Sequence, residues 1–237
     1  MLEDKLLHCF FYLSTNIYNK IQMKIVKINE NLIEEDYPVG FNMDELKSLK
    51  TFKQKAEYCA KTLKRLSSGS SRIVYLVDNT KVLKLAKNKK GLAQNRAEAD
   101  SHIQDYDCFA KVFDSDYDDY WVEMELAKKC SKSDFQQIVG LSLEQVYSAI
   151  EYHHSDVAGI KYNKFTTREG KEIFKQYGDE NELLFNLTHF IADYHLKGIG
   201  DFGTLSSYGI VERNGKPTVV LIDYGLNNRA YDMYFDN

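Results

Sequence analysis

Two aspartates in this chain each stand before an aromatic residue and a glycine, in the tripeptides DFG at 201–203 and DYG at 223–225. Two carboxylates that lie close together repel each other unless a cation lies between them or one of them binds a proton. A magnesium ion that also binds a nucleotide phosphate would relieve this repulsion. The alternative is that each aspartate only caps a turn, as Asp often does beside Gly. The two residues therefore form a candidate site if the fold brings them together.

A β-hairpin between the two tripeptides would bring them together. The runs 208–212 and 218–222 are strand-like, and the Asn214-Gly215 dipeptide between them favours the positive φ angles of a tight turn. In an antiparallel hairpin, the start of the first strand lies beside the end of the second. We therefore expect Asp201 and Asp223 at one end of the hairpin, although 22 positions separate them.

A second hairpin, upstream, carries a lysine near a loop of small residues. Strand-like runs flank the Asp-Asn-Thr turn at 78–80, and the small residues of 67–71 precede the first of these runs. With this turn, Lys84 lies across from Val74, and its ammonium would point beneath the loop, where backbone N–H groups can approach phosphate oxygens. The alternative is a lysine on the solvent face of the sheet.

The helix that is expected to begin after Gly91 supplies an acid that can pair with Lys84. Glu98 is the expected partner, and Asp100 is the alternative, because a small error in the helix phase would exchange the two. A further apolar strand is expected over 120–127.

Taken in chain order, these features resemble the protein-kinase-like fold. The loop with Gly69, Ser70 and Ser71 is similar to the glycine-rich loop of that family, and the run VLKLA is similar to the strand that carries its phosphate-binding lysine. The resemblance implies that the loop and Lys84 hold the phosphates of ATP, and that Glu98 fixes Lys84.

A third segment resembles the strand that enters the hinge of that family. This segment is VEMELA at 122–127. The resemblance implies that Met124 lies at the back of the nucleotide pocket. It also implies that backbone groups between Glu125 and Ala127 face adenine.

The two aspartate tripeptides take different roles in this resemblance. GIGDFG is similar to the catalytic loop, which implies that Asp201 orients or deprotonates the acceptor hydroxyl. VLIDYGL is similar to the metal loop, which implies that Asp223 holds Mg²⁺. A serine stands where the family has its second metal-binding residue, an asparagine, and either Ser206 or Ser207 would replace it.

The chain also departs from the family. Ile199 and Gly200 stand where the catalytic loop has His and Arg, and the Gly-Asp pair is closer to aminoglycoside-phosphotransferase-like kinases of small molecules. As a whole, the chain resembles the small kinase-like proteins of large bacteriophages. Only 12 residues follow Gly225, so no activation segment is expected and the substrate class does not transfer.

The order of strands and helices predicts an α+β protein with two lobes. Residues 1–60 are expected to form an extension with helical stretches over 2–13 and 42–59. This extension either packs against the main body or docks a partner. Residues 61–127 are expected to form a β-rich N-lobe, and residues 128–237 a short, mostly helical C-lobe.

Three long helices are expected in the C-lobe. Ser142 and Gln145 give the first a capping-box pattern. Gly178 is expected to end the second helix and Gly198 the third.

Neither the histidines nor the cysteines suggest a metal site. His153 and His154 are adjacent on a helix, so their side chains point about 100° apart, and we expect both on the surface. The cysteines have no C-x-x-C spacing and are expected to be free thiols in a reducing cytosol, at Cys9, Cys59, Cys108 and Cys130.

The overall charge argues against some classes of partner. A net charge of -4 and a pI near 5.9 argue against a dedicated nucleic-acid binder. The first five residues lack the positive start of a signal peptide, and the apolar stretch 6–13 is too short to span a membrane. The expected location is the cytoplasm, which would be the host cytoplasm, or the virion, for a phage protein.

The leading hypothesis is a phosphotransferase that uses ATP and Mg²⁺ and transfers phosphate to a protein Ser or Thr hydroxyl. The first alternative is a pseudokinase, or a virion or host-interaction module that keeps the fold without catalysis. The second alternative is a small-molecule kinase. A nucleotide is the expected ligand, and a host or phage protein is a candidate substrate.

Overall fold

The computed structural model describes residues 37–159 and 164–225, and only the backbone of 164–167. The described residues from Pro38 onward belong to one compact unit. The helical stretch expected over 2–13 lies outside the described residues. The divisions expected at residues 60 and 127 stay predictions.

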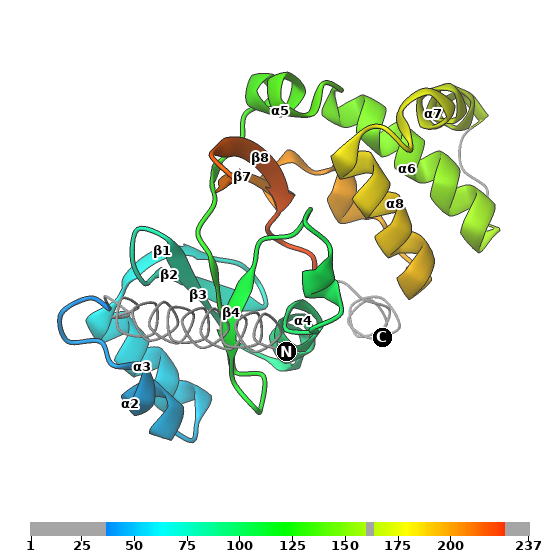
Figure 1. Ribbon diagram of the computed structural model, residues 1–237. Coiled ribbons are helices and arrows are strands. Elements are labelled where there is room, and N and C mark those ends of the chain that lie inside the picture. The colour runs from blue at the N-terminus through cyan, green and yellow to red at the C-terminus, as the bar shows by residue number, and fades with distance from the viewer. Residues whose placement is uncertain (1–36, 160–163, 226–237) are drawn as a thin grey trace, which may run out of the picture. The chain divides into compact units, whose positions relative to one another are not determined.

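A five-stranded antiparallel sheet forms the strand-rich part of the chain, in the order β1-β2-β3-β5-β4 (Figure 1). Its strands are β1 (Lys64–Ser68), β2 (Arg72–Leu76), β3 (Lys81–Ala86), β4 (Val112–Ser115) and β5 (Trp121–Glu125). Val74 pairs with Lys84 across β2 and β3, as the 78–80 turn predicts. β5 ends two residues before the expected strand, because the chain leaves this sheet to pair with another.

The helix that packs on this sheet is α4 (Lys89–Glu98), which contacts β3 and β5. It begins earlier than the expected start after Gly91. The reason is a cap: the side chain of Asn88 accepts the backbone N–H of Gly91 at 3.1 Å.

Two helices replace the single helix expected over 42–59. They are α2 (Met43–Ser48) and α3 (Phe52–Thr62). Thr51 separates them, because its side chain and that of Gln54 form a capping box that begins a new helix. The apolar spacing continues in phase across the break, so the pattern alone did not reveal it.

Ion pairs attach both helices to the sheet. Lys47 of α2 lies 2.7 Å from Asp114 of β4, and the buried Lys55 of α3 lies 3.3 Å from Asp116. The described part of the segment before residue 60 therefore packs against the main body, which was one of the two alternatives.

A second sheet has the order β6-β7-β8, with β6 (Lys128–Lys129), β7 (Tyr208–Arg213) and β8 (Lys216–Leu221). Asn214 and Gly215 have φ angles of 52° and 74° and form the tight turn expected from their sequence. The last residue of β8, Leu221, forms backbone hydrogen bonds with the segment after α4. The N–H of Leu221 donates to the carbonyl of Cys108 at 2.7 Å, and the N–H of Ala110 donates to the carbonyl of Leu221 at 3.0 Å.

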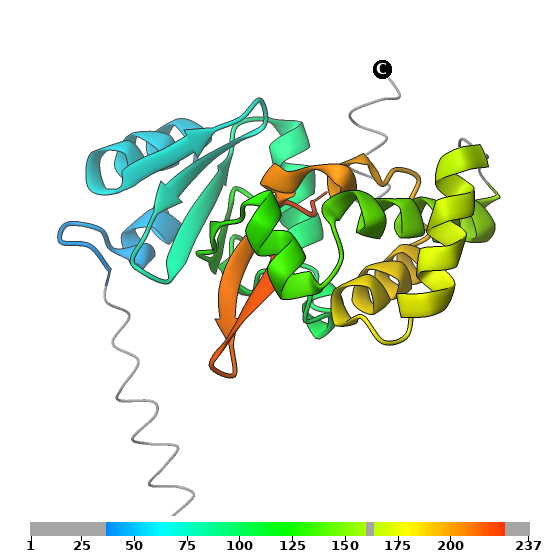
Figure 2. The same cartoon turned by 90° about the horizontal axis from the view of Figure 1, so that it is seen from above.

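The helical part contains α5 (Lys132–Val139), α6 (Leu143–Ala158), α7 (Lys164–Tyr177) and α8 (Glu182–Tyr194). Figure 2 shows α6, α7 and α8 grouped together, beside the β7–β8 hairpin. The capping box of Ser142 and Gln145 is confirmed, and α7 ends directly before Gly178. α8 ends at Tyr194 rather than near Gly198, because His195 takes the left-handed conformation with φ of 47°.

The expectation that both histidines of α6 lie on the surface is wrong. His154 is buried, and its Nε2 lies 2.5 Å from the carbonyl oxygen of Leu196. His153 is half-buried and packs against the ring of Phe174. The physical reason is that α7 and α8 both contact α6, so more than one face of this helix is covered.

A strand-rich part followed by a mostly helical part confirms the α+β class. A core of aromatic side chains links the segment after α4 to α8 and to the DYG tripeptide, with Phe109 against Phe190 and Tyr224. Across 37–159 and 164–225, no helix combines the length and apolarity that a membrane crossing requires. The cysteines in this part of the chain are buried free thiols, at Cys59, Cys108 and Cys130, whereas Cys9 lies outside it.

Candidate functional site

A cavity of about 360 Å³ collects most of the residues that the sequence singles out. Its wall combines residues of β1, β2, β3 and β5 with residues at the end of the β7–β8 hairpin. The expected site residues on this wall are Gly69, Ser71, Lys84, Met124, Glu125, Ala127, Ser206 and Asp223. Three others, Ser70, Glu98 and Asp201, are not on the wall.

The register of the sheet explains why these side chains share one face. Residues that pair directly in an antiparallel sheet point to the same side, and so do residues two apart on one strand. Lys84 pairs with Val74, and Val82 pairs with Met124. By the same rule Arg72, two residues before Val74, points to the side of Lys84 and reaches the cavity.

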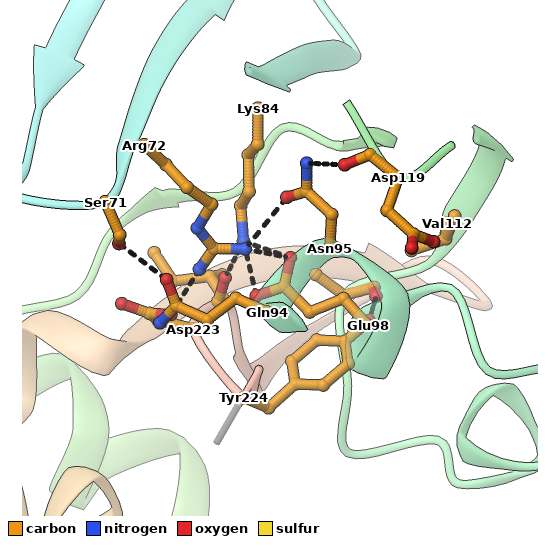
Figure 3. Close-up of polar contacts among 12 residues, drawn as sticks. Ser71, Arg72, Lys84, Gln94, Asn95, Glu98, Val112, Asp119, Asp223 and Tyr224 are labelled. Carbon is orange, nitrogen blue, oxygen red and sulfur yellow. Dashed lines mark hydrogen bonds and ion pairs between the residues drawn. The ribbon is translucent and has the colours of Figure 1, made fainter. Parts of the chain in front are cut away.

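Lys84 and Glu98 form a buried ion pair beside this cavity (Figure 3). The Nζ of Lys84 lies 3.0 Å from both carboxylate oxygens of Glu98, and it donates to the carbonyl of Ile222 at 2.6 Å. Burial lowers the pKa of Lys84, and the carboxylate of Glu98 opposes this shift. Glu98 is the last residue of α4 and is fully buried, whereas Asp100, the alternative partner, is half-exposed.

Arg72 is a site residue that the sequence reasoning missed. Its Nη1 lies 2.7 Å from Glu98 Oε2, and its Nη2 lies 2.6 Å from Asp223 Oδ1. Figure 3 shows its guanidinium beside the ammonium of Lys84, with both aimed at Glu98. The signal was present in the sequence, because the register that places Lys84 opposite Val74 also places Arg72 on the same face.

Side chains of the segment after β3 donate hydrogen bonds to carbonyl groups of the loop of small residues. Lys87 Nζ donates to the carbonyl of Gly69 at 2.8 Å, and the Asn88 side chain donates to that of Ser70 at 3.1 Å. The hydroxyl of Ser71 donates to the side chain of Gln94 at 2.6 Å. Ser70 is exposed, so only part of the expected phosphate loop faces the cavity.

The segment after β5 presents few backbone donors to the cavity. The N–H of Glu125 donates to the carbonyl of Lys111 at 2.8 Å, and the N–H of Leu126 donates to that of Thr80 at 2.6 Å. The carboxylate of Glu125 pairs with the guanidinium of Arg213 on the β7–β8 hairpin. Met124 is fully buried and lines the cavity.

The two aspartates come close enough to interact. Burial first, and the carboxylate of Asp223 second, raise the pKa of Asp201, whereas Arg72 opposes the shift. Asp201 lies in the short helix η2 (Gly200–Gly203) just before the hairpin, as expected from the sequence. Asp223 follows β8, and its side chain is 52% exposed at the cavity wall.

The serines that follow Asp201 differ in their surroundings. Ser206, in η3 (Leu205–Ser207), lines the cavity. Ser207 is buried, and its carbonyl accepts the backbone N–H of Ile222 at 2.7 Å. Of the two, Ser206 is the one whose position allows contact with a ligand in this cavity.

The ion pair with Arg72 competes with the predicted role of Asp223 as a magnesium ligand. Mg²⁺ requires near-octahedral oxygen coordination. Among the residues that the structure describes, no group of three or more His, Cys, Asp or Glu side chains is placed to hold a metal ion. One oxygen of Asp223 is already paired with Arg72. A nucleotide fits better, because the cavity is apolar at Met124 and bordered by two cations at its other end.

Tyr224 and Gly225 fix the tripeptide that carries Asp223. The hydroxyl of Tyr224 donates to the carbonyl of Ala110 at 2.8 Å and accepts a hydrogen bond from the Gln104 side chain at 3.0 Å. A Cβ at Gly225 would lie 2.8 Å from the Cβ of Gln94, so α4 passes too close for a side chain there. Gly225 therefore allows the tripeptide to pack against α4, and Tyr224 ties it to the segment after α4.

No protein-family model and no curated protein matches the sequence. The solved structures similar to this chain include a ternary complex of APH(2'')-IIa with streptomycin and ATP, with a TM-score of 0.33, 15% identity, and coverage of 75% of this chain and 71% of that chain. They also include the ADP-bound aminoglycoside phosphotransferase APH(2'')-Ib, with a TM-score of 0.31, 15% identity, and coverage of 73% and 69%. At this distance the likeness carries no conclusion about activity, so the interpretation below depends on this chain's own contacts.

Proposed function

We propose that this protein is a phosphotransferase that binds a nucleoside triphosphate in the 360 Å³ cavity and transfers its terminal phosphate to a hydroxyl group. The observation that carries the proposal is that Lys84, which is paired with the buried Glu98, lines the same cavity as Asp223. An ammonium fixed by a carboxylate at the polar end of a cavity is suited to hold phosphate oxygens. Asp201, on the adjoining loop, supplies a carboxylate for the acceptor.

The base of the nucleotide would lie at the apolar end of this cavity. Val82 and Met124 line that end, and the backbone there belongs to the segment 125–127. Because the N–H groups of Glu125 and Leu126 already donate to carbonyls within the protein, the N–H of Ala127 is the donor that we assign to the base. The carbonyl of Glu125 would accept from an exocyclic amine, which favours adenine.

Asp201 has the properties of a general base in this proposal. Burial and the carboxylate of Asp223 raise the pKa of Asp201, which makes this carboxylate a stronger proton acceptor. In the transfer step, the hydroxyl oxygen of the acceptor bonds to the γ-phosphorus while its proton passes to Asp201. The bond between the γ-phosphorus and the β,γ-bridging oxygen breaks, and the nucleoside diphosphate leaves with that bonding electron pair. Lys84 neutralises charge on the phosphates.

The acceptor is the least constrained part of the proposal. A protein Ser or Thr hydroxyl and a small-molecule alcohol both provide the chemistry that Asp201 requires. A non-catalytic nucleotide-binding module is the second candidate. The ion pair between Arg72 and Asp223 favours it, because this pair engages the residue that the sequence predicts as a metal ligand.

Calorimetric titration with ATP, combined with transfer of a γ-labelled phosphate, tests the proposal. Asp201→Asn should keep ATP binding and lose about 10²–10⁴-fold in transfer rate. Lys84→Met should weaken ATP binding itself. Lys53→Met is the matched control, because Lys53 lies on α3 with a side chain that is 84% exposed.

The two measurements separate the candidates. An absence of ATP binding would exclude both the phosphotransferase and the nucleotide-binding module. ATP binding without transfer to either the protein or the small-molecule fraction would favour the non-catalytic module. Label in one of these two fractions would identify the class of acceptor.

A further inference from the structure

The ion pair between Arg72 and Asp223 joins two parts of the site that a nucleotide would have to bridge. Arg72 is the first residue of β2, directly after the loop of small residues, and Asp223 follows β8. Only 8% of the Arg72 side chain is exposed, and the residue borders the cavity. A buried arginine aimed into a proposed phosphate site requires an explanation beyond the packing of the sheet.

We infer that the guanidinium of Arg72 takes the place of a divalent cation beside Asp223, so that this cavity binds nucleotide phosphates without a metal ion. The inference rests on the proposed function and deepens it, because it assigns a phosphate-binding residue and the metal independence of the site. It concerns the binding step and involves no transfer of electrons or groups.

The charges around Arg72 support this role. Lys84 and Arg72 carry one positive charge each, and both contact Glu98, while Arg72 also contacts Asp223. Two cations therefore face the carboxylates of Glu98 and Asp223, and the carboxyl group of Asp201 also interacts with Arg72 and Asp223. A divalent cation at Asp223 would add two positive charges next to a guanidinium that already lies 2.6 Å from this carboxylate. Like charges at such a distance repel strongly in a partly buried site.

The two ends of the guanidinium differ in a way that suits phosphate binding. Its Nη1 end contacts Glu98, which is fully buried and fixes the side chain from behind. Its Nη2 end contacts Asp223, which is 52% exposed at the cavity wall. A phosphate that enters the cavity and approaches the Nη2 end competes with the exposed carboxylate of Asp223. Arginine is suited to this exchange, because its planar group binds phosphate in the geometry in which it binds carboxylate.

A purely structural role for Arg72 predicts different behaviour. If Arg72 only ties β2 to the loop after β8, then its removal lowers stability and leaves the metal dependence of nucleotide binding unchanged. If Arg72 replaces the cation, then its removal creates a metal requirement that the wild-type protein lacks. The readout is therefore the ratio of affinities with and without Mg²⁺, which a loss of stability alone does not change.

Calorimetric titration of the full chain with ATP and with inorganic tripolyphosphate, each in EDTA and in Mg²⁺, measures this ratio. The wild-type Kd for ATP should differ by less than about threefold between the two conditions. Arg72→Gln should weaken binding in EDTA by about tenfold or more, and Mg²⁺ should restore a part of it. Arg96→Gln is the matched control, since Arg96 is 54% exposed and pairs with Asp119.

Asp223→Asn is a second variant, and its effect on the ATP affinity distinguishes metal-free binding from binding through a metal ion at Asp223. Asp223→Asn removes the competitor for Nη2 and should strengthen ATP binding in EDTA. If Asp223 instead holds a metal for the nucleotide, the same change weakens ATP binding in Mg²⁺ and has no benefit in EDTA. This variant also keeps the inference testable if Arg72→Gln does not fold.

The outcomes separate this inference from the proposed function. Wild-type ATP binding that requires Mg²⁺ would overturn the inference and leave the proposed function intact. Binding of tripolyphosphate but not of ATP in EDTA would support the role of Arg72 and overturn the proposed function. No binding of either ligand in either condition would overturn both.

Discussion

Gly91 of α4 lies so close to Ser71 that no side chain fits between them. A Cβ at position 91 would stand 2.3 Å from the carbonyl oxygen of Ser71 and 3.0 Å from the Cα of Ala86. The same Ser71 carbonyl accepts the backbone N–H of Lys87 at 2.7 Å. The loop of small residues and the start of α4 are therefore one packed unit, and the glycine is what allows it.

Replacing Gly91 by alanine should destabilise the protein, although alanine is the better helix former. The added methyl group forces α4 away from the loop, and such overpacking costs about 1–3 kcal/mol. Urea unfolding of Gly91→Ala measures the loss. Gly200→Ala is the control, because a Cβ there meets no atom within 4 Å. Equal stability of the two variants would mean that α4 and the loop do not pack as described.

Removing the negative charge of Glu98 should cost far more than removing an exposed one. Glu98→Gln removes the buried carboxylate that contacts both Lys84 and Arg72. Breaking a buried ion pair from one side costs about 3–5 kcal/mol. Glu57→Gln is the comparison, since Glu57 is 68% exposed and faces Lys53 at 4.0 Å. That change should alter the free energy of unfolding by less than about 0.5 kcal/mol.

Asp201→Asn should raise stability at neutral pH while it lowers the proposed transfer rate. Burial and the carboxylate of Asp223 raise the pKa of Asp201 above its usual value of 3.8, so the folded protein binds this proton more tightly than the unfolded chain. The stability that this proton contributes is fully present below the unfolded pKa and is lost as the pH rises through the folded pKa. At neutral pH the wild type therefore carries an unfavourable carboxylate that asparagine removes.

The advantage of Asp201→Asn should shrink as the pH falls, because the wild-type carboxyl then becomes protonated. Chemical denaturation at neutral and at mildly acidic pH measures the difference between the two proteins. A constant difference across this range would show that asparagine acts through packing rather than through charge.

Tyr224→Phe should destabilise the loop that carries Asp223. The hydroxyl donates to Ala110 and accepts from Gln104, and its loss leaves a buried carbonyl without its donor. Such a loss costs about 1–3 kcal/mol. Tyr117→Phe should have no effect, because Tyr117 is 98% exposed. Thermal unfolding of both variants makes the comparison, and a similar Tm for both would contradict the described contacts.

Local rules made most of the fold predictable from the sequence. The Asn214-Gly215 turn depends on two residues whose backbone preferences hold in any context. The pairing of Val74 with Lys84 follows from the position of the 78–80 turn, because residues of an antiparallel hairpin pair in order outward from the turn. The same counting placed the tripeptide of Asp201 before the hairpin and that of Asp223 after it.

Other features depend on contacts between distant segments, which a pattern of residue types does not contain. The ion pair of Arg72 with Asp223 depends on how the loop after β8 packs against the sheet. The start of α3 and the early end of α8 depend on caps at Thr51 and His195, and the apolar periodicity continues past both. His154 is buried because two helices cover α6, which its own helical spacing does not reveal.

The separation of Arg72 and Asp223 by 151 positions also determines when this site can form during synthesis. Lys84 and Glu98 are only 14 positions apart, so the early part of the chain can pair them as soon as β3 and α4 form. The carboxylate of Asp223 emerges from the ribosome 151 residues after Arg72, and closing so long a loop is slow compared with forming a local hairpin. A nascent chain therefore holds Arg72 and Lys84 against one carboxylate, with an excess of positive charge, until β8 has folded.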